Sequence, residues 1–250
     1  MARYDVLLIG SAVVAAVVFI SLQFIAAPYG RHTRGGWGPQ ISSRLGWIVM
    51  EGVAVFAIAF FCFRERPEMT PALWILLGLW ELHYVNRAFI YPLRMRTRGK
   101  TNPISVVVMA MAYNTWNGYL NGHWLGTHAH AYGQDWLSRP AVIAGILVFF
   151  AGMAINIWSD EILLQLRKTP DGGYSIPRGG LYRWVSCPNY LGELIEWTGW
   201  AMMAWSPEGL VVVVGPATNL GPRARSDHKW YQEKFGDYRA DRKAIVPFVY

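Results

Sequence analysis

The chain has 250 residues, of which 53% are hydrophobic and only 16% charged. Soluble domains carry about 25% charged residues, so this composition argues against an ordinary soluble chain and favours a membrane protein or an unusually large apolar core. The net charge is +7, but the basic residues form separate clusters beside apolar runs. That pattern excludes the single basic face of a nucleic-acid-binding protein and favours an anionic lipid or an anionic cofactor as partner.

The first predicted element is residues 6–27, an uncharged run of 22 residues. At about 1.5 Å per residue, a helix of this length crosses the hydrocarbon core of a bilayer. A cleaved signal peptide has a shorter apolar core of about 7 to 15 residues and precedes a soluble domain. Because further apolar runs follow this one, we predict a retained transmembrane helix.

Six further apolar segments are mostly separated by Pro, Gly or charged residues. They lie at residues 45–63, 71–91, 103–120, 140–158, 189–205 and 209–220. The last of them is short and contains Pro216, so its length alone is typical of a buried or re-entrant piece.

Lysine and arginine are distributed unevenly along these segments. If all seven cross the membrane in turn, 19 of the 23 basic residues fall on one side and 4 on the other. The positive-inside rule then predicts an external N-terminus and a cytoplasmic C-terminus. Because the two termini then lie on opposite sides of the membrane, the number of crossings must be odd. We therefore count residues 209–220 as the seventh transmembrane helix. The sequence therefore predicts an all-α polytopic integral membrane protein with about seven transmembrane helices, forming a single domain over residues 1–250.

Polar residues occur inside these predicted spans. Glu51, Glu81, Glu193 and Glu196 would be costly facing lipid, and such residues usually face a cavity or a partner. Neutral glutamic acids that hydrogen-bond between helices are the structural alternative. A further pattern, the row Gly118, Gly122 and Gly126, predicts close packing of helices.

Three polar stripes follow helical spacing towards the predicted cytoplasmic ends of the spans. The stripes are Tyr84, Arg87 and Tyr91; Asn156, Asp160 and Arg167; and Asn189, Glu193 and Glu196. Together they predict a polar chamber in the cytoplasmic half of the protein.

A basic cluster lies beside this chamber and suits phosphate binding, although positive-inside topology also explains it. It comprises Arg94, Arg96, Arg98 and Lys100, and the sequence leaves open which of these arginines would contact a 2′-phosphate. The chain has neither a G-x-G-x-x-G fingerprint nor a P-loop motif, so a dinucleotide must bind among helices and loops.

Several stretches resemble the steroid 5α-reductase family. They are PYGRHT at 28–33, HYVNRAFIYP at 83–92, GMAINIWSDEILLQLRK at 152–168, YSIPRGGLYRWVSCPNYLGELIEW at 174–197 and WYQEKFGDYRADRKAIVPFVY at 230–250. The resemblance extends over nearly the whole chain and is most specific in its C-terminal two fifths.

The resemblance implies a seven-helix membrane enzyme that binds NADPH on the cytosolic side and a 3-oxo-Δ4 steroid in the adjoining cavity. Glu51 and Tyr84 match the catalytic pair that hydrogen-bonds the C3 ketone of the steroid. The positions that match cofactor contacts are Trp47, Arg87, Tyr91, Asn156, Asp160, Arg167, Tyr174, Asn189, Glu193, Arg223 and Tyr231. The roles of Asp227 and His228 stay open, because the stretch RARSDHKWY departs from the mammalian pattern.

The resemblance further implies a monomer in the lipid bilayer, with an active site that opens to the cytosol and no metal. In a bacterium the protein would lie in the cytoplasmic membrane.

Hydride addition to C5 of the enone drives negative charge onto the ketone oxygen, which needs preorganised donors. A tyrosine hydroxyl and a neutral, buried glutamic acid are suitable donors. The nicotinamide carries the redox chemistry, while the protein positions it and excludes water.

Three other functions fit parts of the pattern. A related reductase of an enoyl-CoA, a polyprenol or a sterol would use nearly the same chemistry. A membrane methyltransferase of the isoprenylcysteine type shares a polar helix pair near its C-terminus, but usually carries Arg-His-Pro where this chain has Ser186, Cys187 and Pro188. A transporter or channel would need polar residues that reach both faces of the membrane, whereas here they gather on the inner side, except for Glu51 and Glu81 at mid-depth.

Overall fold

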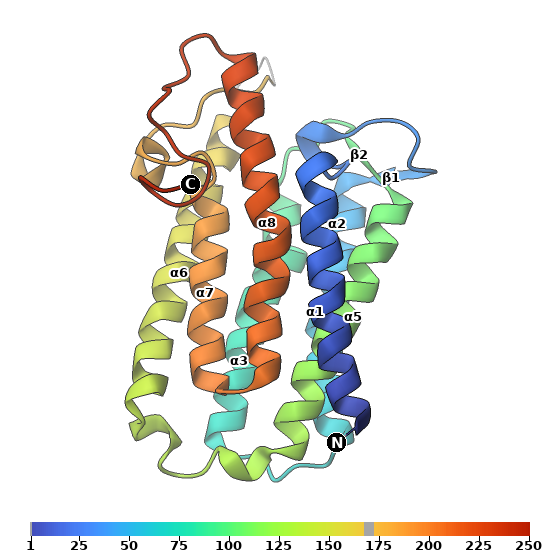
Figure 1. The fold of residues 1–250 in the computed structure, drawn as a ribbon, viewed down its shortest axis with the longest axis vertical. Helices are drawn as coiled ribbons and strands as arrows, with labels where there is room; N and C mark the ends of the chain where they lie inside the picture. The colour runs from blue at the N-terminus through green and yellow to red at the C-terminus, as the bar shows by residue number, and fades with distance from the viewer. Residues whose placement is uncertain (1, 168–172) are drawn as a thin grey trace. The chain divides into compact units, whose positions relative to one another are not determined.

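The computed structural model describes residues 2–167 and 173–250, and helices make up most of its elements (Figure 1). The last residue of the 152–168 stretch lies outside this part. The chain divides into two compact units. Unit 1 comprises Met1–Ala26, Gly145–Ala201 and Leu210–Tyr250, and unit 2 comprises Ala27–Ala144 and Met202–Gly209.

Seven helices of 15 or more residues occur in the described part of the chain, which confirms the predicted helical character. They are α1 (Ala2–Phe24), α2 (Ser43–Arg64), α3 (Pro71–Val85), α5 (Ile104–Thr127), α6 (Pro140–Leu166), α7 (Pro188–Ala204) and α8 (Pro207–Lys234). Three of them, Val6–Phe24 within α1, α2 and α6, are long and apolar enough to cross a membrane. The crossing of all seven and the orientation of the termini stay predictions.

Short elements join the helices. The 3-10 turns are η1 (Gly30–His32), η3 (Ala129–Ala131), η4 (Trp136–Ser138) and η5 (Gly180–Arg183). In unit 2, strand β1 (Gln40–Ser42) pairs antiparallel with β2 (Thr101–Pro103), with Ile41 opposite Asn102. The sequence did not predict this sheet, because three residues are too few to show a strand period.

Two predicted segments differ in detail from the helices observed. The segment 71–91 is not one regular α-helix: α3 is followed by a π-helical segment, η2 (Asn86–Ile90), and by α4 (Tyr91–Arg94). The segment 209–220 lies within α8, which has 28 residues and contains Pro216 and Pro222. Helix α8 runs past residue 220 because the following residues are polar but include good helix formers such as Arg, Ala, Lys, Gln and Glu.

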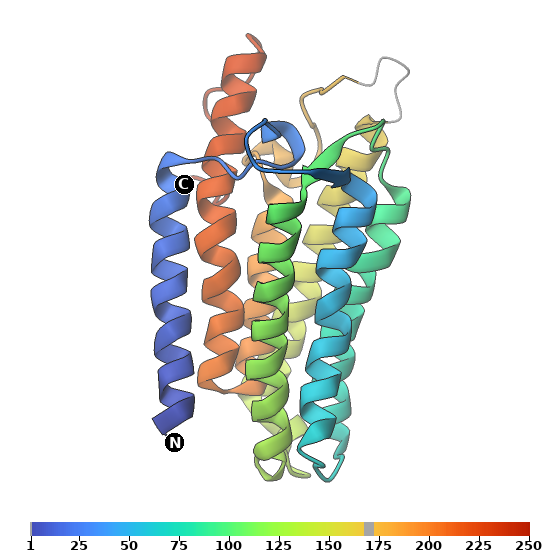
Figure 2. The same ribbon diagram turned by 90° about the vertical axis from the view of Figure 1, so that its right-hand side faces the viewer.

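In unit 2, α2 packs closely against α5, and Figure 2 shows the two helices side by side. A Cβ atom on Gly118 would lie 2.5 Å from the Cβ of Ala57, and one on Gly122 would lie 2.4 Å from the carbonyl oxygen of Ile58. These distances confirm the predicted role of the glycine row in close helix packing. Helix α3 is linked to α2 by Trp80, whose Nε1 donates a hydrogen bond of 3.1 Å to the carbonyl of Ala54.

In unit 1, a second set of glycines brings α6 and α7 into backbone contact (Figure 1). A Cβ on Gly152 would lie 2.2 Å from the Glu196 nitrogen, and one on Gly192 would lie 2.4 Å from the Asn156 nitrogen. Because the two backbones touch, polar side chains on the facing turns of α6 and α7 are held in a fixed register.

Apolar side chains cover the outer faces of the candidate spans. On α1 they include the exposed Val13, Val17 and Ile20, and on α6 the exposed Leu147 and Phe150. Apolar surface on this scale is unusual on a soluble monomer and suits contact with lipid.

Candidate functional site

The two polar stripes predicted in unit 1 meet where α6 faces the start of α7. Asn156 Nδ2 donates to the backbone carbonyl of Asn189 at 2.9 Å, and Asn189 Nδ2 donates to Asp160 Oδ1 at 3.0 Å. Asn156 and Asp160 are buried. The structure therefore brings three predicted cofactor residues into one amide and carboxylate network.

A second network of unit 1 joins α7 to α8. Arg223 Nε donates to the Tyr190 hydroxyl at 3.0 Å, and this hydroxyl donates to Asp227 Oδ2 at 3.3 Å. Arg223 and Asp227 are buried. Asp227, whose role the sequence left open, thus shares a network with a predicted cofactor residue. Sequence reasoning missed Tyr190; its position beside Asn189 in a motif already singled out was the available signal.

Aromatic rings link three further predicted residues of unit 1, Arg167, Tyr174 and Tyr231. The Arg167 guanidinium carbon lies 5.4 Å from the ring centroid of Tyr174, and the Tyr174 ring lies 4.9 Å from that of Trp230. Trp230 in turn lies 5.3 Å from the buried Tyr231, which stacks on Tyr238 at 5.2 Å. A guanidinium beside flat rings is suited to a ligand with both phosphate and planar groups. Trp230 was not predicted as a site residue.

His228 belongs to a hydroxyl network next to these rings. Its Nδ1 lies 2.6 Å from Ser186 Oγ, and its Nε2 lies 2.9 Å from Gln232 Nε2. Ser186 Oγ also lies 2.6 Å from the Tyr238 hydroxyl and donates to the carbonyl of Lys243. Burial lowers the pKa of His228 below its ordinary value of 6.5, and the positive charges of Lys243 and Arg242 lower the pKa further. The imidazole is thereby kept neutral near pH 7.

This lowered pKa predicts a pH-dependent stability. When the pH falls below about 6.5, the unfolded chain takes up a proton at His228 before the folded protein does, so the free energy of unfolding should decrease. Thermal melting between pH 7.5 and 5 should show this loss. His228→Asn, which keeps a donor near Nδ1 but cannot titrate, should remove part of the pH dependence. An identical pH profile in this variant would contradict the assignment.

In unit 2, Arg87 lies between two aromatic rings. Its guanidinium carbon is 5.3 Å from the centroid of Trp47 and 5.1 Å from that of Tyr91, and Trp47 Nε1 donates to the Arg87 carbonyl at 2.9 Å. Arg87 belongs to the π-helical segment, a distortion frequent at functional sites. The structure thus brings together these three predicted residues. The exposed arginines of the 94–98 cluster follow them in the chain.

The two predicted catalytic residues also belong to unit 2. Glu51, on α2, is half-buried, and its Oε2 lies 3.5 Å from Nδ2 of Asn114 on α5; the same nitrogen donates to the Met50 carbonyl at 2.7 Å. Tyr84, on α3, is buried, and its ring lies 5.0 Å from Trp80 and 4.9 Å from His83.

Asn114 was missed as a candidate although the sequence carried a signal. Asn114, Asn117 and Asn121 follow i, i+3 and i+7, the first two inside the predicted span 103–120 and the third directly after it, and all three are buried in the structure. Of the predicted acids of unit 1, Glu193 is half-buried and Glu196 fully buried on α7. Among the residues that the structure describes, no group of three or more His, Cys, Asp or Glu is arranged to hold a metal ion.

Span-like helices and buried networks of amides, acids and guanidinium groups define a membrane-type helical protein with a polar interior. Residues 100–250 match the sequence model of a family described as 3-oxo-5-alpha-steroid 4-dehydrogenase. The chain is 44% identical over 243 residues to steroid 5-alpha-reductase DET2 of Gossypium hirsutum, covering 95% of this chain and 94% of that protein. It is 37% identical over 247 residues to 3-oxo-5-alpha-steroid 4-dehydrogenase 1 of Mus musculus, covering 98% and 96%.

The corresponding human protein, 3-oxo-5-alpha-steroid 4-dehydrogenase 1, is 37% identical over 242 residues, covering 95% of this chain and 92% of that protein. These matches define an oxidoreductase that acts on CH–CH bonds. The chain belongs to the 3-oxo-5-alpha-steroid 4-dehydrogenase family.

Proposed function

We propose that this chain reduces the Δ4 double bond of 3-oxo-Δ4 steroids with NADPH, by hydride transfer to C5. The observation that carries the proposal is the similarity to named steroid 5-alpha-reductases over 95% of the chain. We further propose that the protein acts as one domain, a monomer that crosses the bilayer seven times, with its C-terminus and the entrance for the cofactor in the cytosol. The uneven distribution of Lys and Arg supports this orientation.

The side chains of unit 1 offer the kinds of group that a phosphorylated dinucleotide needs. Arg167 and Arg223 supply guanidinium groups suited to phosphate, and Tyr174 supplies a flat surface. The linked amides and carboxylate of Asn156, Asn189 and Asp160 suit hydroxyl and carboxamide groups, which need both donors and acceptors. In unit 2, the Arg87 guanidinium held between Trp47 and Tyr91 is a further candidate contact. When bound, NADPH supplies the hydride.

Glu51 and Tyr84 would act on the ketone end of the substrate. As hydride reaches C5, electron density moves through C4 to the oxygen on C3, and two donors at that oxygen stabilise the enolate. The Asn114 amide donates towards Glu51 Oε2, which favours a carboxyl proton on Oε1 as the hydrogen-bond donor. The Tyr84 hydroxyl is the second donor, and its packing against Trp80 and His83 restricts its position.

The proposal is tested with purified protein in lipid membranes, by following NADPH oxidation against a panel of conjugated substrates. We expect turnover with a 3-oxo-Δ4 steroid and formation of the 5α-reduced product, with little turnover of an enoyl-CoA or a polyprenol. Turnover of an enoyl-CoA without turnover of the steroid would reverse the assignment. Binding of S-adenosylmethionine in place of NADPH would instead indicate a methyltransferase.

Arg167→Ala should weaken NADPH binding by about tenfold or more, because a charge-assisted hydrogen bond contributes about 1.5–3 kcal/mol. Titration of the purified variant by calorimetry or by fluorescence measures the change in dissociation constant. Arg225→Ala serves as the matched control, since Arg225 is an exposed arginine of α8 that contacts Gln23. Equal affinities in the two variants would remove Arg167 from the cofactor site.

A further inference from the structure

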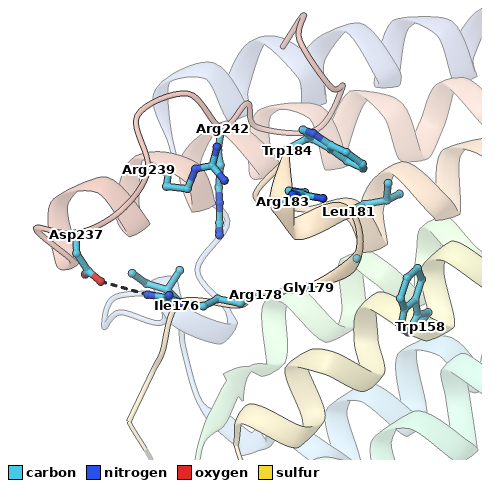
Figure 3. A pocket seen from close by; sticks show the side chains of 11 residues that line it. Trp158, Ile176, Arg178, Gly179, Leu181, Arg183, Trp184, Asp237, Arg239 and Arg242 are labelled. Atoms are coloured by element: carbon cyan, nitrogen blue, oxygen red, sulfur yellow. Dashed lines mark ion pairs between the residues drawn. The ribbon is translucent and has the colours of Figure 1, made fainter.

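Unit 1 contains an arginine-rich cleft that none of the proposed catalytic or cofactor residues lines. The cleft has a volume of about 800 Å³ and lies among the C-terminal part of α6, the turn η5 with the residues just before it, and the segment that follows α8. Figure 3 shows arginine side chains that line the cleft from the region of η5 and from the segment after α8. Trp158 and Trp184 are among the other lining residues. Its arginines are Arg178, Arg183, Arg239 and Arg242.

The charges of the cleft are only partly compensated. Arg178 Nη2 lies 3.5 Å from Asp237 Oδ2, and Arg239 Nε donates to Asp241 Oδ1 at 2.9 Å. Arg183 is exposed, with its guanidinium carbon 5.9 Å from the ring centroid of Trp184. Among the described residues, two carboxylates therefore pair with four guanidinium groups, which makes this part of the cleft positive and attractive to an anion.

Arg242 is the most informative of these side chains. It is only 5% exposed, yet neither its Nε nor its Nη1 makes a hydrogen bond within the described part of the chain. Its guanidinium carbon lies 5.0 Å from the ring centroid of Tyr238. This cation–π contact stabilises the positive charge but gives the N–H groups no hydrogen-bond acceptor. Buried donors without acceptors are costly, so an anionic acceptor in the cleft would relieve that cost.

The apolar residues of the cleft indicate where such an anion resides. Trp158 is 56% exposed and is the last residue of the predicted span 140–158, in the C-terminal part of α6, a candidate membrane span whose outer face also carries Phe150 and Ile157. Trp184, 39% exposed, lines the same cleft. Exposed tryptophans at the end of a span are typical of the membrane–water interface. An anion-binding cleft at this depth meets lipid headgroups.

We propose that this cleft binds the phosphate headgroup of an anionic phospholipid. Arg242 and Arg183 would contact the phosphate, while Trp158 and Trp184 would pack against the glycerol and the first carbons of the acyl chains. The inference requires α6 to be a membrane span, but it requires neither the steroid nor NADPH. Lipid binding at this cleft can therefore succeed or fail independently of the proposed reaction.

The test uses the full chain in phosphatidylcholine nanodiscs that contain brominated phosphatidylglycerol, whose bromines quench nearby tryptophans. We expect stronger quenching than with brominated phosphatidylcholine, and native mass spectrometry should show retained phosphatidylglycerol. Arg242→Gln should weaken this retention by at least about fivefold, the effect of one basic residue near an anionic surface. Arg183→Gln should weaken the retention of phosphatidylglycerol to the same extent. Because Arg183 is exposed, this variant should fold normally, so it tests the cleft even if Arg242→Gln misfolds. Arg225→Gln, outside the cleft, should behave as the unchanged chain.

Two competitors separate the possible sources of the anion. Inorganic phosphate that binds in place of the lipid, with no preference for phosphatidylglycerol over phosphatidylcholine, would overturn the proposal. Displacement of phosphatidylglycerol by NADPH would assign the cleft to the dinucleotide and would also overturn it. Equal retention of both lipids, or full retention in Arg242→Gln and Arg183→Gln, would have the same consequence. A preference for phosphatidylglycerol over phosphatidylcholine that NADPH does not reduce is the supporting result, whether or not a high concentration of inorganic phosphate competes.

Discussion

Glu51→Gln is expected to lower turnover by about 10²–10³-fold while leaving NADPH affinity unchanged, the range measured when one donor to a developing oxyanion is removed. An amide keeps the size and a weak N–H donor, but it cannot present the acidic proton that stabilises the enolate oxygen. Asn114 donates to the Glu51 carboxyl group, and a glutamine oxygen can accept the same bond. The loss should therefore appear in the chemical step rather than in folding or cofactor binding.

Single-turnover kinetics with saturating NADPH measures this loss directly. Glu81→Gln is the matched control, because Glu81 is another half-buried acid of unit 2 and the proposed mechanism gives it no role. Tyr84→Phe, which removes the second donor, should also slow hydride transfer. A Glu51→Gln enzyme with a rate near that of the unchanged protein would exclude Glu51 from the site.

Gly152→Ala should destabilise the protein strongly. The added Cβ would lie 2.2 Å from the Glu196 nitrogen and 2.6 Å from the Gly192 carbonyl oxygen, and both are backbone atoms of α7 that cannot rotate away. Overpacking costs about 1–3 kcal/mol or more, which corresponds to roughly 2–12 °C in melting temperature for a chain of this size. Shifting α7 would also disturb the bond between Asn156 and Asn189.

The control for this variant is Gly10→Ala, in α1 of the same unit, where an added Cβ meets no described atom within 4 Å. Alanine is a better helix former than glycine, so this change should leave the melting temperature unchanged or raise it slightly. Thermal unfolding in detergent compares the two variants. If both melt at the same temperature, α6 and α7 do not depend on the contact at Gly152.

The helices could be predicted because charge and apolar sequence are segregated along the chain. The run 6–27 and the segment 45–63 consist mostly of apolar residues, which favour a helix in an apolar environment. Both are helical in the structure, apart from residues 25–27 at the end of the first run. The π-helical segment after Val85 was not predictable, because a period of 3.6 residues was assumed throughout. Helix α8 is longer than its apolar part, since polar residues continue a helix without leaving a hydropathy signal.

The sequence predicted which polar residues lie together better than it predicted the contacts between them. Helical spacing and the family resemblance together identified Asn156, Asp160 and Asn189, which the structure links through hydrogen bonds. Tyr190 and Trp230 were missed because their importance comes from partners distant in the chain, Arg223 with Asp227 and Tyr174 respectively. Such pairings depend on how α7, α8 and the preceding loop pack, which no local pattern encodes.

The central claim is that this chain delivers a hydride from NADPH to C5 of an enone whose ketone is held by protein donors. Reduction of a 3-oxo-Δ4 steroid with NADPH deuterated at C4 of the nicotinamide, in each of its two stereoisomers, tests it most directly. The account predicts that one stereoisomer places deuterium at C5 of the 5α product, while the hydrogen added at C4 comes from solvent. A reduced product without deuterium at C5 from either stereoisomer, or no reduced steroid at all, would contradict it.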